Sequence, residues 1–136
     1  MGGYFPGFVA ATSIDRFELA NDNITGSVRQ NLNVSRTYST SISAKDYSYA
    51  AIGYTGAAYV SSVERLDNSN ENVQLSFRGA LPQSGVEKSG FNTAFFGWVS
   101  GGRDAAGSTG SLVHRITFSS DLATASARGN ITPFGA

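Results

Sequence analysis

Few residues of this chain have side chains suited to catalysis or to metal binding. His114 is the only histidine and cysteine is absent, which excludes a disulfide framework and any thiolate metal site. A catalytic His114 would need an activated nucleophile beside it, and the chain has no Gly-x-Ser-x-Gly motif to supply one. The sequence therefore predicts no catalytic residue, no metal ligand and no cofactor, and we expect that the protein is not an enzyme.

One acidic run has the oxygen spacing of a cation-binding loop. Asp67-Asn68-Ser69-Asn70-Glu71 places oxygen-bearing side chains at alternate positions, but it lacks the sixth-position glycine and the distal glutamate of an EF-hand. Because Asn and Asp favour tight turns, we interpret this run as a turn.

The arginines follow a regular spacing. They form three pairs separated by 13 residues each: Arg16 with Arg29, Arg65 with Arg78, and Arg115 with Arg128. An acid lies between the members of each pair, at Asp22, Glu71 and Asp121. An unpaired buried guanidinium is costly, so these arginines either bind acids or backbone carbonyls between repeats, or form a ring that faces a ligand. Features present in every repeat usually serve stacking, so we expect a structural role.

A glycine–aromatic pair precedes each copy, at Gly3-Tyr4, Gly53-Tyr54 and Gly97-Trp98. Tyr4, Tyr54 and Trp98 are either core aromatics or platforms on which a sugar ring stacks.

The third copy also contains a glycine-rich segment, residues 101–111, so that 18 residues separate Gly97 from Arg115, against 13 and 12 in the other copies. An insertion of this kind is a candidate contact site for a ligand or a partner. It includes Gly101, Gly102, Arg103 and Asp104, and it lacks the Lys-Ser/Thr of a phosphate-binding loop.

The elements that would position these residues are β-strands. Residues 14–19 and 24–29 alternate in polarity around an Asx-rich turn, which predicts an antiparallel hairpin with Arg16 opposite Ser27. Residues 38–43 suit an edge strand, and Tyr47–Tyr54, with its counterpart at residues 92–99, suits a strand buried on both faces. No segment shows helical periodicity. Four strands in every 44–50 residues predict β-propeller blades.

These features resemble kelch-like propeller repeats. The third copy has Gly101-Gly102 close to the position of the kelch double glycine, whereas the first two copies have Pro6-Gly7 and Gly56-Ala57. The chain is more similar to a kelch-like repeat of structural proteins in tailed phages, notably those of marine cyanobacteria. The similar segments are Gly3-Tyr4-Phe5, Ile14-Asp15-Arg16-Phe17, residues 121–126 and Arg128-Gly129. The resemblance implies a non-enzymatic virion component.

Composition restricts the partners. Lys+Arg and Asp+Glu both number 10, so the net charge is zero and no long-range field attracts phosphates. We therefore expect neither nucleic acid nor membrane as a partner. The N-terminus lacks the basic and apolar regions of a signal peptide, and no run approaches the ~20 apolar residues that span a bilayer. We expect a soluble protein without a signal peptide, located in the virion if the phage resemblance holds.

We expect one repeat domain, residues 1–136, with repeats at about 3–52, 53–96 and 97–136. Propellers close with about 4–8 blades, so three copies leave the ring incomplete in one chain. Because open ends expose strand edges, we expect a homo-oligomer or docking on other virion proteins, unless the chain is part of a longer array. The alternative function is a carbohydrate-binding propeller that recognises surface glycans through Tyr4, Tyr54 and Trp98.

Overall fold

The computed structural model describes residues 4–5, 9–17, 20 and 25–132, and these contain β-strands, one 3₁₀ turn and no α-helix. The elements are β1 (Tyr4–Phe5), β2 (Val9–Ala10), β3 (Ser13–Arg16), β4 (Ser27–Asn31), β5 (Thr40–Ser43), β6 (Tyr47–Tyr54), β7 (Tyr59–Asp67), β8 (Ser76–Ala80), β9 (Gly85–Val86), β10 (Ser89–Asn92), β11 (Phe96–Ser100), β12 (Arg103–Asp104), β13 (Leu112–Thr117), η1 (Phe118–Ser120) and β14 (Ser126–Asn130). None of these elements is a helix long and apolar enough to cross a membrane.

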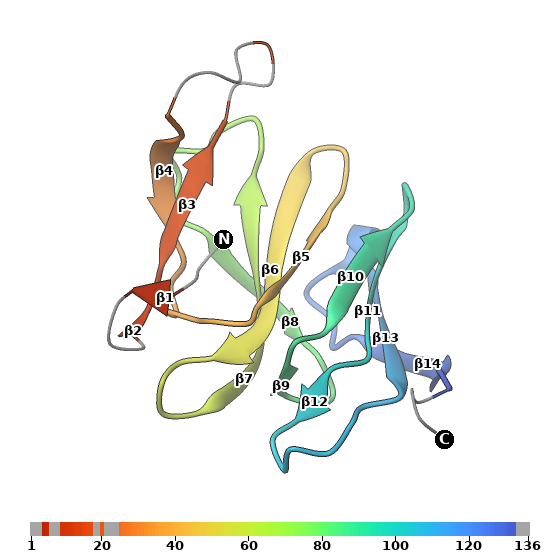
Figure 1. The fold of residues 1–136 in the computed structure, drawn as a ribbon. Helices are drawn as coiled ribbons and strands as arrows, with labels where there is room; N and C mark the ends of the chain where they lie inside the picture. Colours follow the sequence, from red (N-terminus) through yellow and green to blue (C-terminus); the bar gives the residue numbers. More distant parts are fainter. Residues whose placement is uncertain (1–3, 6–8, 18–19, 21–24, 133–136) are drawn as a thin grey trace.

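The strands form three main antiparallel sheets that lie in a row in chain order (Figure 1). The first sheet is the pair β3-β4, the second is β5-β6-β7-β8, and the third is β10-β11-β13-β14. Two short ladders, β1-β2 and β9-β12, complete the topology. The predicted all-β fold with four-stranded antiparallel repeats is confirmed for the second and third sheets. The first sheet contains only the last two strands of the pattern within the described residues, and the row does not close into a ring.

Strand registers confirm the predicted hairpin. Arg16 pairs with Ser27, Arg65 with Ser76 and Arg115 with Ser126. The Asp67–Glu71 run is a turn, as predicted, because the Oδ1 atom of Asp67 accepts hydrogen bonds from the backbone N–H and the hydroxyl of Ser69.

The registers also correct one predicted equivalence. Thr40 pairs with Ala51 in the second sheet, and Ser89 pairs with Ser100 in the third. Counting on from these pairs, Gly53-Tyr54 corresponds to Gly102-Arg103, so its predicted equivalence with Gly97-Trp98 is wrong. Gly97-Trp98 lies inside β11 and corresponds to Ser48-Tyr49. Gly53-Tyr54 and Gly97-Trp98 each place a large aromatic residue after a glycine, which explains the mistaken match.

This correction removes the predicted insertion at residues 101–111. Gly102 precedes Arg115 by 13 residues, just as Gly3 precedes Arg16, while Gly53 precedes Arg65 by 12. The glycine-rich segment is therefore the third copy of a stretch of similar length that the sequences of the other repeats also contain.

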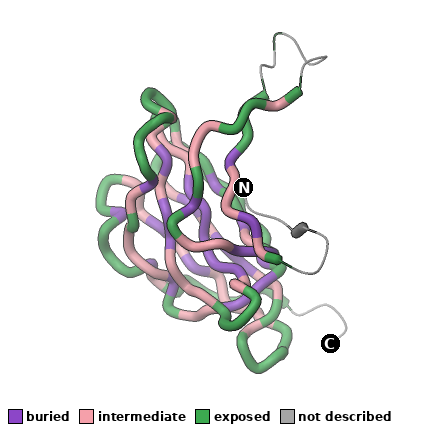
Figure 2. Tube along the Cα trace, turned by 90° about the vertical axis from the view of Figure 1, so that its left-hand side faces the viewer, coloured by how far each residue is buried: buried purple, intermediate pink, exposed green. Residues whose placement is uncertain are grey.

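The apolar core lies between the sheets. One cluster joins Ile14 and Leu32 of the first repeat to Ala50, Leu66 and Leu75 of the second. The larger cluster joins the second sheet to the third, and its members are Ile42, Tyr49, Ala51, Ile52, Val63, Leu81, Val99, Ile116 and Ala125. Figure 2 shows the buried residues concentrated along the middle of the strands, with the turns exposed. Each large apolar side chain buried in this way contributes about 1.5–3 kcal/mol.

Strand β6 is the centre of this stack. Its small residues Ala50 and Ala51 are completely buried and point to opposite faces, one toward the first sheet and the other toward the third. Small side chains at these positions let both neighbouring sheets approach closely. The prediction of a strand buried on both faces at Tyr47–Tyr54 is confirmed. Its predicted counterpart at residues 92–99 is wrong in its bounds, because residues 93–95 form the turn between β10 and β11 and the strand begins at Phe96.

Candidate functional site

Arginine–acid contacts connect the first sheet to the second. The Nη1 atom of Arg16 lies 2.9 Å from Oε2 of Glu71, and Nε of Arg29 lies 3.5 Å from the same oxygen. Glu71 belongs to the turn between β7 and β8. The arginine pair of one repeat thus binds the acid of the next repeat.

The same arrangement connects the second sheet to the third. The Nη1 atom of Arg65 lies 2.9 Å from Oδ2 of Asp121, and Nε of Arg78 lies 3.6 Å from it. The hydroxyl of Tyr49 donates a hydrogen bond of 2.9 Å to the same oxygen. Burial and this hydrogen bond raise the pKa of Tyr49. Two of the three arginine pairs therefore connect neighbouring sheets through an acid, and we call each arrangement an arginine clasp.

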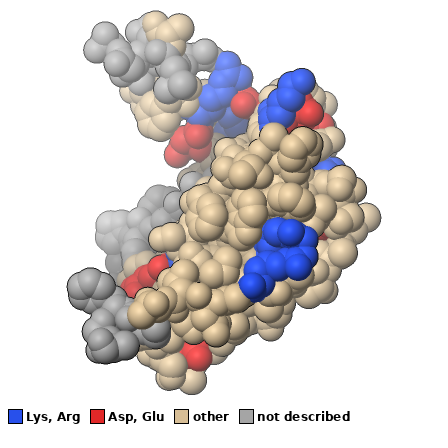
Figure 3. Space-filling model, turned by 90° about the vertical axis from the view of Figure 1, so that its right-hand side faces the viewer, with Lys and Arg blue, Asp and Glu red and all other residues tan. Residues whose placement is uncertain are grey.

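The third arginine pair has no such partner among the described residues. The guanidinium of Arg115 lies 4.3 Å above the ring of Phe96, as that of Arg65 lies 3.9 Å above Tyr47. No ion pair joins Arg115 or Arg128 to an acid in the part of the chain that the structure describes. The third sheet lies on the right in Figure 1, and the view from that side shows a compact basic patch on a largely uncharged face (Figure 3).

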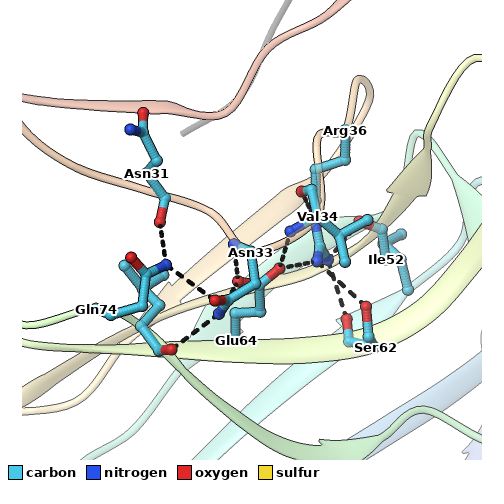
Figure 4. Close-up of polar contacts among 9 residues, drawn as sticks. Asn31, Asn33, Val34, Arg36, Ile52, Ser62, Glu64 and Gln74 are labelled. Carbon is cyan, nitrogen blue, oxygen red and sulfur yellow. Dashed lines mark hydrogen bonds and ion pairs between the residues drawn. The ribbon is translucent and has the colours of Figure 1, made fainter.

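A separate, completely buried ion pair supports the second sheet (Figure 4). Arg36 and Glu64 bind each other, and neither side chain is exposed. Arg36 also donates to the carbonyls of Ile52 and Ser62, while Glu64 accepts from the backbone and side-chain N–H groups of Asn33. Burial lowers the pKa of Arg36, and the charge of Glu64 opposes that shift. Because this network satisfies polar groups of several segments and has no access to solvent, its role is structural.

His114 occupies the position of Glu64 in the third sheet, since both pair with the equivalent residue of the preceding strand. His114 is completely buried, and neither ring nitrogen has a hydrogen-bond partner among the described residues. The Nζ atom of Lys88 donates to the carbonyl of Gly101 at 3.0 Å, as Arg36 does to Ile52. Burial and the charge of Lys88 both lower the pKa of His114. The histidine is therefore a neutral core residue with no route to a substrate.

Two of the predicted binding residues come together in a surface hollow of about 330 Å³. Tyr54 and Arg103 line it, together with Tyr38, Tyr59, Val86 and Glu87. The rings of Tyr54 and Tyr59 are 5.1 Å apart, and Nε of Arg103 lies 3.4 Å from Oε2 of Glu87. This combination of exposed aromatic faces with a charged pair suits a polar ligand that has an apolar face.

The other predicted binding residues lie elsewhere or support the backbone. Trp98 stacks on Phe91 at 5.4 Å, on the face of the third sheet that points away from the second. Tyr4 is in β1, where it pairs with Ala10.

Residues 101–104 form the backbone beside the hollow. Gly101 and Gly102 have φ values of +70° and +71°, and a Cβ at Gly102 would overlap the carbonyl of Val86. Asp104 accepts hydrogen bonds from the backbone N–H groups of Ala106 and Ser108, which closes the following turn.

Sequence reasoning missed four residues of the hollow, namely Tyr38, Tyr59, Val86 and Glu87. Tyr59 lies opposite Tyr54 in the β6-β7 ladder, which the hairpin register would have indicated. Tyr38 and Glu87 occupy equivalent positions and both have positive φ, at 52° and 58°. No local sequence signal marks those two residues, because tertiary contacts bring them to the hollow.

A second hollow, of about 450 Å³, is lined by Ala94, Phe95, Phe96, Thr117, Phe118 and Ser119. It lies at one end of the third sheet. Three of its six lining residues are phenylalanines and none is charged, so it offers apolar contact area without charged groups that would orient a polar ligand.

No protein-family model matches the chain. A search of curated proteins finds no match either. The structure defines an all-β protein of stacked antiparallel sheets. Function therefore has to be inferred from the geometry of the chain itself.

Proposed function

We propose that this chain is a non-enzymatic structural protein that assembles through protein–protein contacts of its sheet faces. The sheets would be blades of a kelch-like β-propeller whose ring a single chain leaves incomplete. Two features support this proposal: the second and third sheets are four-stranded meanders, and consecutive sheets pack face to face through apolar clusters.

One observation carries the proposal. Each contact between sheets uses the arginine pair of one repeat and the acid of the next. The pair on the third sheet, Arg115 and Arg128, has no acid among the described residues. A face that repeats the composition of a contact between two sheets of the chain, without a covering sheet among the described residues, favours assembly over catalysis.

The resemblance to phage structural repeats extends the proposal to a virion component of a tail or capsid-associated assembly. Its partners would be further copies of the chain or other virion proteins. With a net charge of zero, the chain has no field to attract nucleic acid or an anionic membrane.

Analytical ultracentrifugation of the whole chain over a wide concentration range tests the assembly role. We expect defined species heavier than one chain, with populations that rise with concentration. A chain that remains monomeric throughout would contradict assembly through its own faces.

A carbohydrate-binding role is the second candidate, and the tyrosine-lined hollow favours it. Three tyrosines surround one charged pair there, and Tyr38 and Tyr59 expose 46% and 39% of their surface. A sugar ring could stack on these faces while Arg103 and Glu87 bind its hydroxyls.

A glycan array separates the two functions. If the hollow binds sugar, Tyr54→Ala abolishes binding, whereas Trp98→Ala, on a different face, preserves it. Absence of binding by the wild-type chain would reject the carbohydrate role for the glycans on the array.

A further inference from the structure

The face of the third sheet that points away from the second has the composition of a buried contact. We call it the outer face, and it consists of Phe91, Trp98, Val113, Arg115, Arg128 and Ile131. The strand registers relate these residues, in the same order, to Ile42, Tyr49, Val63, Arg65, Arg78 and Leu81 of the second sheet.

The two sets differ greatly in exposure. Ile42 and Leu81 are 3% and 2% exposed because the third sheet covers them, whereas Phe91 and Ile131 are 52% and 42% exposed. Trp98 takes the place of Tyr49 and also has a polar hydrogen-bond donor, the indole N–H. The outer face therefore offers apolar side chains and hydrogen-bond donors at the same positions that the second sheet uses to bind the third.

The backbone shows the same difference between the covered face of the second sheet and the uncovered outer face. The N–H of Gly79 donates to the carbonyl of Asp121 at 2.7 Å, and a Cβ at Gly79 would overlap the carbonyl of Ala123 in the third repeat. Gly129 is the counterpart of Gly79 in the third repeat, and open space surrounds it. The glycine at position 79 lets the third sheet approach the second closely. At the outer face, the corresponding space beside Gly129 is not filled by any described residue.

The first sheet, at the other end of the row, also has a face that no sheet of the described residues covers. Phe17 is 61% exposed, although its counterparts Leu66 and Ile116 are 5% and 3% exposed. Asp15 is exposed too, whereas Glu64 and His114 at the same position are completely buried. The far face of the first sheet, which carries Asp15, Phe17 and Val28, thus lacks the cover that the other sheets receive.

We propose that the outer face of the third sheet binds the far face of the first sheet in a second copy of the chain, head to tail. This inference rests on the proposed assembly function and names its partner. Arg115 and Arg128 would clasp an acid of the second copy, while Phe17 would pack against Trp98 and Phe91 as in the contacts within one chain.

The sequence repeat indicates which acid this is. Asp22 stands between Arg16 and Arg29 as Glu71 stands between Arg65 and Arg78. Asp22 lies outside the described residues. The described residues of the outer face therefore define the docking surface, and the substitution of Asp22 in the experiment below tests its role. A head-to-tail contact joins two different faces, so repetition gives either a closed ring or an open filament.

Charge reversal on opposite sides of the contact gives a sharp test. Arg115→Glu removes the clasp on one face, and Asp22→Arg removes it on the other. Each variant alone is expected to self-associate at least about 30-fold more weakly than the wild type, which corresponds to losing an interfacial charge pair. In an equimolar mixture both contacts between unlike chains have opposite charges, because Glu at position 115 faces Arg at position 22 and the unchanged Arg115 faces the unchanged Asp22. We therefore expect heterodimers and longer assemblies in which the two variants alternate.

Native mass spectrometry, with one variant isotopically labelled, identifies those heterodimers. Lys45→Glu, on the exposed turn between β5 and β6, is the matched control and should associate as the wild type does. The exposed Arg128→Glu replaces Arg115→Glu if the latter unfolds. If the wild type associates and Arg115→Glu associates equally well, or if the mixture gives no heterodimer, this docking surface is wrong while the assembly function stands. A wild type that never associates contradicts both.

Discussion

Nη1 of Arg65 lies 2.9 Å from Oδ2 of Asp121, across the boundary between the second and third sheets. The contact joins residues 56 positions apart in the chain. The acid is nearly buried, and Tyr49 and Arg78 approach the same oxygen. An apolar interface alone tolerates sliding, whereas a carboxylate bound by two hydrogen-bond donors and a second guanidinium fixes how one sheet sits on the next.

Replacing this acid should destabilise the fold measurably. Asp121→Ala leaves two guanidinium groups and a hydroxyl without their acceptor, so we expect the free energy of unfolding to fall by about 2–3 kcal/mol. Urea denaturation measures the loss. Glu71→Ala is the matched variant in the first clasp, where the Arg16 side chain is 41% exposed, so we expect a loss of only about 0.2–1 kcal/mol. Equal losses in the two variants would contradict the difference in burial.

The ion pair between Arg36 and Glu64 predicts a larger effect. Arg36→Met leaves the Glu64 carboxylate buried without its counter-charge, which should cost about 3–5 kcal/mol of unfolding free energy. Lys88→Met is the natural control, because Lys88 reaches the equivalent place in the third sheet but lies beside His114 and forms no ion pair with a described residue, although the charge of Asp104 acts on it. Its removal breaks one hydrogen bond and relieves the histidine, so a loss near 1 kcal/mol is expected. Thermal and chemical denaturation measure both losses of unfolding free energy. If Lys88→Met cost as much as Arg36→Met or more, the buried pair would not contribute the expected stability.

Comparison of sequence and structure shows which features are local. The pairing of Arg16 with Ser27 follows from polarity alternation, and the bounds of β6 follow from a short apolar run with small residues, so both were predictable. The acids that bind the arginines were also foreseen as candidates. That the first and second arginine pairs bind the acid of the next repeat was not, because sheet stacking places that acid and the sequence alone does not.

Two features of the candidate site could not be predicted from the sequence, because they also depend on contacts between segments that are far apart in the chain. Gly97-Trp98 resembles Gly53-Tyr54 in letters, but hydrogen-bond register makes Gly102 the counterpart of Gly53. Tyr38 and Glu87 reach the hollow through the bridge from Thr37 to Tyr54 and the ladder from Val86 to Arg103. Such non-local pairings leave no periodic trace in the segments that form them.

His114 predicts a dependence of stability on pH. Its folded-state pKa lies below the usual 6.5 because burial and Lys88 disfavour the charged ring. Above pH 6.5 the ring is neutral in both states. As the pH falls below that value, the unfolded chain binds a proton that the folded chain does not, so the free energy of unfolding decreases until the folded-state pKa is reached.

Urea denaturation across this pH range measures the effect. His114→Gln is the reference, because it removes the titrating ring and leaves every carboxylate of the chain in place. We expect the wild type to lose more stability than His114→Gln as the pH falls below 6.5. Lys88→Met should reduce the difference, because one cause of the lowered pKa is gone. Parallel curves for the wild type and His114→Gln would show that the ring keeps an ordinary pKa in the folded chain.

Phe17 and Leu66 separate folding from assembly, because they occupy one repeat position in two environments. Leu66 is 5% exposed between the first and second sheets, so Leu66→Ala should cost about 2–5 kcal/mol of unfolding free energy. Phe17 is 61% exposed, so Phe17→Ala should change the stability of a dilute, dissociated chain by no more than about 0.5 kcal/mol. If the far face of the first sheet binds a second copy, Phe17→Ala should nevertheless weaken self-association strongly in sedimentation equilibrium. A Phe17→Ala chain that associates like the wild type would show that this face is not part of the contact.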